Sequence, residues 1–121
     1  NLWDYDVVEC FLVGAGGRYL EIELGAAGHF LVLEFDAPRR RVNEHAALAP
    51  PLWFRAEEQR WHAGLRLPLA LVPAGLLALN AFAIAGGEFF AHHALPGAEP
   101  DFHQPHAFPR AALACERSEL C

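Results

Sequence analysis

Short alternating runs separated by glycine-rich turns constrain the fold of this chain more than any other feature. Residues 18–24 alternate between apolar and polar side chains with a period of two, which is the pattern of a β-strand. Residues 5–13 precede this run across a glycine-rich turn, and residues 29–35 follow it across a second one. Short turns of this kind join antiparallel neighbours. The sequence therefore predicts an antiparallel meander of three strands.

Further apolar runs along the chain predict more strands, at residues 53–59, 61–69, 77–85 and 88–94. Residues 36–51 have no clear period, and this segment is long enough to be a functional loop or a crossover to a second sheet. The Ala and Leu content of residues 69–85 also allows a short helix. We expect a single all-β domain over residues 1–112, a two-sheet antiparallel β-sandwich, followed by a polar tail at residues 113–121.

Composition and charge narrow the classes of partner. A chain of 121 residues suits one domain, and a formal net charge of -6 argues against nucleic acid as a partner. No apolar run approaches the roughly 18 residues that a membrane-spanning helix needs. Cys10, Cys115 and Cys121 have no metal-binding spacing, and we expect a reducing, cytoplasmic setting. The sequence does not determine the oligomeric state.

Three local patterns together resemble a known family, and they lie at Leu2–Glu9, Tyr19–Leu24 and Pro100–His103. They resemble an uncharacterised protein family of bacteria and animals, which is similar in turn to the family 9 carbohydrate-binding modules and the DOMON-like β-sandwiches. The resemblance implies a carbohydrate-binding-like fold but brings no established activity. Members of the family carry a further N-terminal segment, so we expect this chain to lack the first strand or strands of its sandwich.

The strand at residues 18–24 carries the strongest candidate site. If Leu20, Ile22 and Leu24 face the core, Tyr19, Glu21 and Glu23 face outward, with Glu9 and Glu34 beside them on the flanking strands. Aromatic faces pack on sugar rings and carboxylates bind hydroxyl groups, so such a surface suits a glycan. The alternative is that these residues form the ordinary solvent-facing side of a sheet.

Two other groups of residues complete the candidates. Trp3 and Tyr5 lie where the first predicted strand begins. They either form a ligand-binding surface at the rim of the sandwich or are buried side chains that fill its open end. The segment after residue 91 offers metal ligands at His92, His93, Asp101, His103 and His106, although its prolines do not hold a helical ligand face. We expect Asp101 and His103 instead to fix a turn by hydrogen bonding. Calcium at Asp4, Asp6 and Glu9 is a weaker alternative.

These observations favour a non-catalytic binding domain for a saccharide or another small polar ligand. The predicted ligand-binding residues are Trp3, Tyr5, Glu9, Tyr19, Glu21, Glu23, Asp101 and His103. No catalytic residue, metal ligand or cofactor is predicted. Two alternatives remain open: a metal-dependent enzyme or metal-binding protein built on the His/Asp loop, and an interaction domain without a small ligand.

Overall fold

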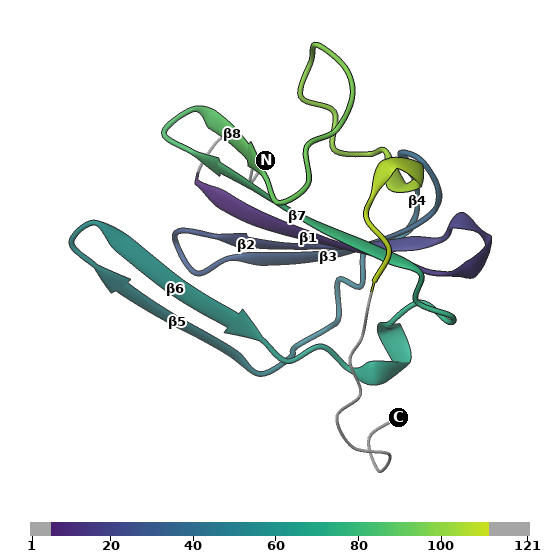
Figure 1. Ribbon diagram of the computed structural model, residues 1–121. Coiled ribbons are helices and arrows are strands. Elements are labelled where there is room, and N and C mark those ends of the chain that lie inside the picture. The colour runs from purple at the N-terminus through teal and green to yellow at the C-terminus, as the bar shows by residue number, and fades with distance from the viewer. Residues whose placement is uncertain (1–5, 112–121) are drawn as a thin grey trace, which may run out of the picture.

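The computed structural model describes residues 6–111, which form an all-β fold with one large and one small antiparallel sheet (Figure 1). The large sheet has six strands in the order β4-β3-β2-β1-β7-β8, with the bounds β1 (Val7–Val13), β2 (Tyr19–Gly25), β3 (Phe30–Ala37), β4 (Arg40–Asn43), β7 (Ala78–Ala85) and β8 (Glu88–Ala91). The small sheet is a hairpin of two strands, β5 (Leu52–Glu57) and β6 (Arg60–Leu65).

The predicted meander is confirmed, because β1 pairs with β2 and β2 with β3, both antiparallel. The helix considered within residues 69–85 does not form beyond a single 3-10 turn at Leu69–Leu71, and β7 takes most of that segment. The short strand β4 lies inside the stretch expected to be irregular. None of the helical turns in residues 6–111 is long or apolar enough to cross a membrane.

The two faces of the large sheet are covered by different parts of the chain. Figure 1 shows the β5–β6 hairpin on one side of the sheet and the C-terminal segment 92–110 on the other. Leu95, Phe102 and Phe108 of that segment pack on the sheet. A small two-stranded sheet therefore covers one face of the large sheet, and an irregular segment covers the other.

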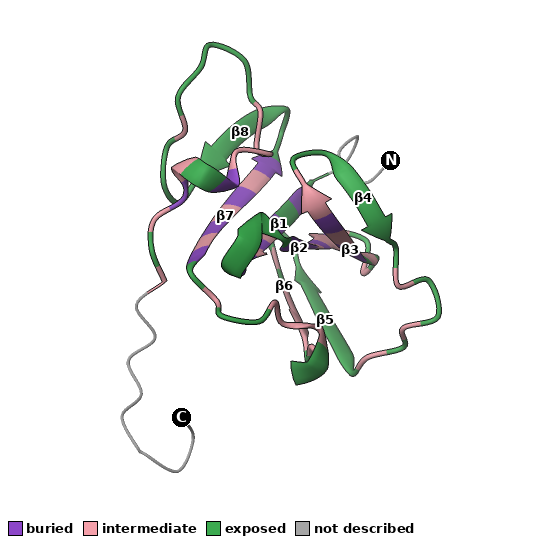
Figure 2. Cartoon of the chain, turned by 90° about the vertical axis from the view of Figure 1, so that its right-hand side faces the viewer, coloured by how far each residue is buried: buried purple, intermediate pink, exposed green. Residues whose placement is uncertain are grey.

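An aromatic core lies between the large sheet and segment 92–110. The ring of Phe11 in β1 is fully buried, with its centroid 5.4 Å from that of Phe82 in β7 and 5.6 Å from that of Phe108. Tyr19 is also fully buried and stacks on Phe35 at 4.7 Å. Figure 2 shows the buried positions alternating along β7, as expected for a strand with one face in the core.

The prediction that Tyr19, Glu21 and Glu23 face solvent is wrong. Their exposed fractions are 0%, 3% and 2%, because the face that carries them is the one that segment 92–110 covers. Leu20 on the opposite face is buried as well, at 1%. Alternation correctly grouped the residues by face, but both faces of β2 are covered, and the row that was expected to face solvent is the more deeply buried one.

Asn80 in β7 fixes where the covering segment leaves the sheet. Its side chain is fully buried, its Nδ2 donates to the carbonyl of His93, and its Oδ1 accepts the backbone N–H groups of Ala81 and His93. These bonds hold the chain just after β8 against β7. Asn80 thus positions the start of the segment that covers the candidate site.

Candidate functional site

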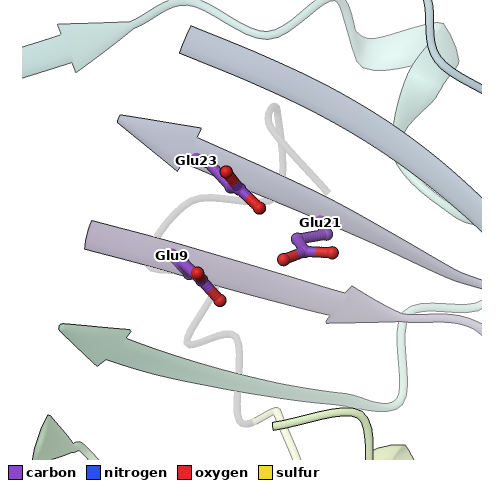
Figure 3. A group of neighbouring side chains, drawn as sticks. All are labelled: Glu9, Glu21 and Glu23. Carbon is purple, nitrogen blue, oxygen red and sulfur yellow. The ribbon is translucent and has the colours of Figure 1, made fainter. Parts of the chain in front are cut away.

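Three glutamate side chains converge on the covered face of the large sheet (Figure 3). Glu9 in β1 lies directly opposite Glu23 in β2, and Glu21 lies two residues before Glu23 on the same face. One carboxylate oxygen of each residue lies within 4.8 Å of those of the other two. The antiparallel register of β1 and β2 therefore brings together three acids from two strands.

Burial makes this cluster electrostatically unusual. Burial and hydrogen bonds with its two neighbours raise the pKa of Glu21 to about 10, and burial with the charge of Glu23 raises the pKa of Glu9 to about 7. Burial also raises the pKa of Glu23. A hydrogen bond between two carboxyl groups needs a shared proton, so Glu21 is the protonated member at neutral pH.

Glu23 keeps one oxygen that no group in the described part of the chain satisfies. Its Oε2 is buried and has no hydrogen-bond partner within residues 6–111. The single proton of Glu21 cannot bond both neighbours at once, so the cluster holds more acceptors than donors. An unsatisfied buried carboxylate oxygen is costly, and it is unusual in a native fold.

A chain of polar contacts links Glu21 to the covering segment. The hydroxyl of Tyr19 accepts the backbone N–H of Arg39 at 3.0 Å and lies 2.8 Å from Nδ1 of His103. In the tautomer that carries its proton on Nε2, Nδ1 accepts the hydroxyl proton of Tyr19. His103 Nε2 lies 3.7 Å from Glu21 Oε2, and burial lowers the pKa of His103. A neutral imidazole ring therefore lies at the edge of the acidic cluster.

The turn around Asp101 closes over the cluster. Oδ1 of Asp101 accepts the backbone N–H of His103 at 3.1 Å, so the predicted hydrogen-bonded turn is confirmed. The same oxygen lies 2.7 Å from the guanidinium of Arg39, which reaches over from the turn between β3 and β4. Phe102 stacks on Phe82 at 4.1 Å. The covering segment is therefore attached to the sheet by polar and aromatic contacts on both sides of the site.

A cavity of about 440 Å³ opens above the three glutamates. Its walls combine acidic, basic and aromatic side chains, with Arg39 and Arg41 on one side and Phe89 on another. The remaining lining residues include Phe35, Asp101, Phe102 and His103. A space of this size accommodates a small ligand, and a few charged groups among apolar walls are typical of ligand pockets.

Similarity to curated proteins supplies a family context for this site. The chain is 36% identical over 116 residues to the human UPF0462 protein C4orf33, with 85% of this chain and 56% of the relative covered. Its homologues are UPF0462 proteins of animals. The zebrafish and rat proteins named as C4orf33 homologues are each 32% identical over 117 residues, covering 86% of this chain and 57% of the relative. No family model matches the chain, and no solved structure matches it significantly.

The UPF0462 homologues support the expectation of an uncharacterised family and assign no ligand. This chain spans a little over half the length of those relatives. The site described above is therefore the main guide to what this chain binds.

The structure brings together five of the eight predicted ligand-binding residues around the cavity, namely Glu9, Glu21, Glu23, Asp101 and His103. Tyr19 is buried beneath His103 and contributes through its hydroxyl group. Trp3 and Tyr5, like Cys115 and Cys121, lie outside the described residues. Glu34, considered as a flanking member, lies on the other face, where it contacts Arg18 and His45.

The histidines of the segment after residue 91 do not converge into the metal site that was considered as an alternative. His92, His93 and His106 are exposed and do not line the cavity. Within residues 6–111, Glu9, Glu21 and Glu23 are the one set of three or more potential metal ligands that converge. The sequence did not indicate Arg39, Arg41 and Phe89 as site residues. A turn and the two edge strands bring these residues to the cavity, and no periodic pattern in the sequence marks such positions.

Proposed function

We propose that this chain is a non-catalytic binding domain for a small polyhydroxylated ligand of the saccharide class, which enters the cavity above the three glutamates. One observation carries the proposal: the cavity joins carboxyl groups, two guanidinium groups and aromatic rings, with Phe89 exposed, in about 440 Å³. Hydroxyl groups both donate and accept hydrogen bonds, so they suit walls that contain acids and arginines together. The proposal extends the resemblance to family 9 carbohydrate-binding modules and DOMON-like sandwiches from sequence to function.

The aromatic rim supplies a second line of support. Phe89 on the edge strand β8 is 53% exposed and lines the cavity, with its ring 6.0 Å from that of Phe102. An exposed aromatic face beside polar groups is how proteins hold the C–H face of a sugar ring. Arg39 and Arg41 on the other side of the cavity would bind hydroxyl or carboxylate groups of the ligand.

The arrangement of the acids favours binding over glycoside hydrolysis. A glycosidase places its two carboxyl groups on either side of the scissile bond, about 5 to 9.5 Å apart. Here one oxygen of each glutamate lies within 4.8 Å of those of the other two, so the acids point at one another and do not flank a substrate from two sides. This arrangement supports a binding role.

A thermal shift screen tests the proposal. The chain is heated with a panel of mono- and oligosaccharides in EDTA, and a ligand at one hundred times its dissociation constant should stabilise it by about 2.7 kcal/mol. Phe89→Ala should abolish the shift produced by any hit. Phe90→Ala is the matched control, because the neighbouring Phe90 is 51% exposed but does not line this cavity.

Two outcomes would overturn the proposal. One is a panel in which no saccharide shifts the unfolding midpoint of the wild-type chain. The other is a hit whose shift is equally large in Phe89→Ala and Phe90→Ala, since such a ligand would bind elsewhere on the surface.

A further inference from the structure

The floor of the cavity has the chemistry of a cation site. Glu9, Glu21 and Glu23 each direct one oxygen toward a common space, with every pair of these oxygens within 4.8 Å (Figure 3). All three side chains are at most 5% exposed, so water does not screen their mutual repulsion effectively. A buried group of like charges needs either protons or a counter-ion.

A second observation points to a ligand at the same place. Oε2 of Glu23 is buried without any hydrogen-bond partner in residues 6–111, and the side chain that carries it is 98% buried, with an exposed fraction of 2%. The proton shared through Glu21 leaves this oxygen unsatisfied. A coordinated cation would satisfy it, because a carboxylate oxygen is a metal ligand as well as a hydrogen-bond acceptor.

We propose that Glu9, Glu21 and Glu23 bind one divalent cation of the oxygen-preferring class, with Ca²⁺ as the best fit. The inference goes beyond the binding of a saccharide and does not depend on it, although both concern the same cavity. The protein supplies three carboxylates from β1 and β2, and the open side of the cavity leaves further coordination positions for water or for hydroxyl groups of a ligand.

The ligand set decides against zinc. The converging ligand atoms are the carboxylate oxygens of Glu9, Glu21 and Glu23. Nε2 of His103 lies 3.7 Å from Glu21 Oε2 and is not one of the converging ligand atoms. Oxygen-only sites suit Ca²⁺, Mg²⁺ and Mn²⁺ better than Zn²⁺.

The coordination preferences of the ions favour Ca²⁺ within this class. The three oxygens all lie within 4.8 Å of one another, so the centre of their triangle is no more than about 2.8 Å from each of them, and the site admits Ca²⁺–oxygen distances of about 2.3 to 2.6 Å. Ca²⁺ tolerates irregular coordination, whereas Mg²⁺ needs a near-ideal octahedron, which three carboxylates on two adjacent strands do not readily provide.

Metal titration of the full chain tests the inference without any saccharide. Isothermal calorimetry after removal of metal with EDTA should give one Ca²⁺ per chain, and Ca²⁺ should raise the unfolding midpoint more than Mg²⁺ or Zn²⁺ does. Glu23→Gln keeps the shape of the side chain and should weaken Ca²⁺ binding by more than about tenfold, because ligand charge sets the affinity of such sites. Glu58→Gln, an exposed carboxyl in the β5–β6 turn, should change nothing.

The outcomes separate this inference from the proposed function. Ca²⁺ binding that is lost in Glu23→Gln and retained in Glu58→Gln supports the site, whether or not a saccharide binds in EDTA. Absence of Ca²⁺ binding to the wild-type chain overturns it, as does Ca²⁺ binding of equal strength in both variants. Zn²⁺ binding that exceeds Ca²⁺ binding and requires His103 would also overturn it, since the ligand set would then include nitrogen.

Discussion

Replacing Glu9 by glutamine should stabilise the chain at alkaline pH and leave it nearly unchanged at acidic pH when metal is removed by EDTA. Folding raises the pKa of Glu9 from 4.5 to about 7, mainly through burial. A carboxyl with a raised pKa holds its proton more tightly in the folded chain. Its contribution to stability is therefore complete below pH 4.5 and is lost as the pH rises to about 7.

The size of the effect follows from this shift. A pKa difference of this size corresponds to about 3 kcal/mol of stability lost by the wild-type chain above pH 7, at about 1.4 kcal/mol for each pH unit. Glu9 is only 5% exposed, so solvent screening removes little of this loss. Glutamine does not ionise and avoids the loss, so Glu9→Gln should unfold about 10 °C higher than wild type at pH 8.5.

Circular dichroism melts at pH 4.5 and pH 8.5 measure the difference. Glu58→Gln serves as the control, because it removes an equivalent charge from an exposed position. The reasoning is refuted if Glu9→Gln shifts the midpoint by the same amount at both pH values, or if Glu58→Gln shows the same pH dependence. Either result would mean that the acids of the cluster are not held in a buried environment.

Two further substitutions test how the covering segment is attached. Asn80→Ala removes three hydrogen bonds from a fully buried side chain and should destabilise the chain by about 2 to 4 kcal/mol in urea melts. A loss below about 0.5 kcal/mol would show that the segment is held by other contacts. Tyr19→Phe leaves the N–H of Arg39 and Nδ1 of His103 without their shared partner, at a cost of about 1 to 2 kcal/mol. In NMR the ring of His103 should then change its tautomer balance, and unchanged ¹⁵N shifts would contradict the hydrogen-bond chain.

The strand pattern could be predicted because it depends on local sequence. Alternation within residues 18–24 and the glycine turns on either side were enough to predict the meander of β1, β2 and β3. The same alternation correctly placed Tyr19, Glu21 and Glu23 on one face. A turn signal in the sequence also predicted the hydrogen bond between Asp101 and His103.

Only the tertiary structure decided that the face with the acidic row is covered. That outcome depends on segment 92–110, which returns across β7 and β1 and is fixed by Asn80 in β7. A period of two shows which residues share a face of the sheet, but burial also requires another part of the chain to pack on that face. Here that part is segment 92–110, which begins about 80 residues after the end of β1. For this reason an acidic row typical of a solvent-facing strand became a buried cluster. The sequence by itself determined that Glu9, Glu21 and Glu23 are available, and tertiary packing made them a site.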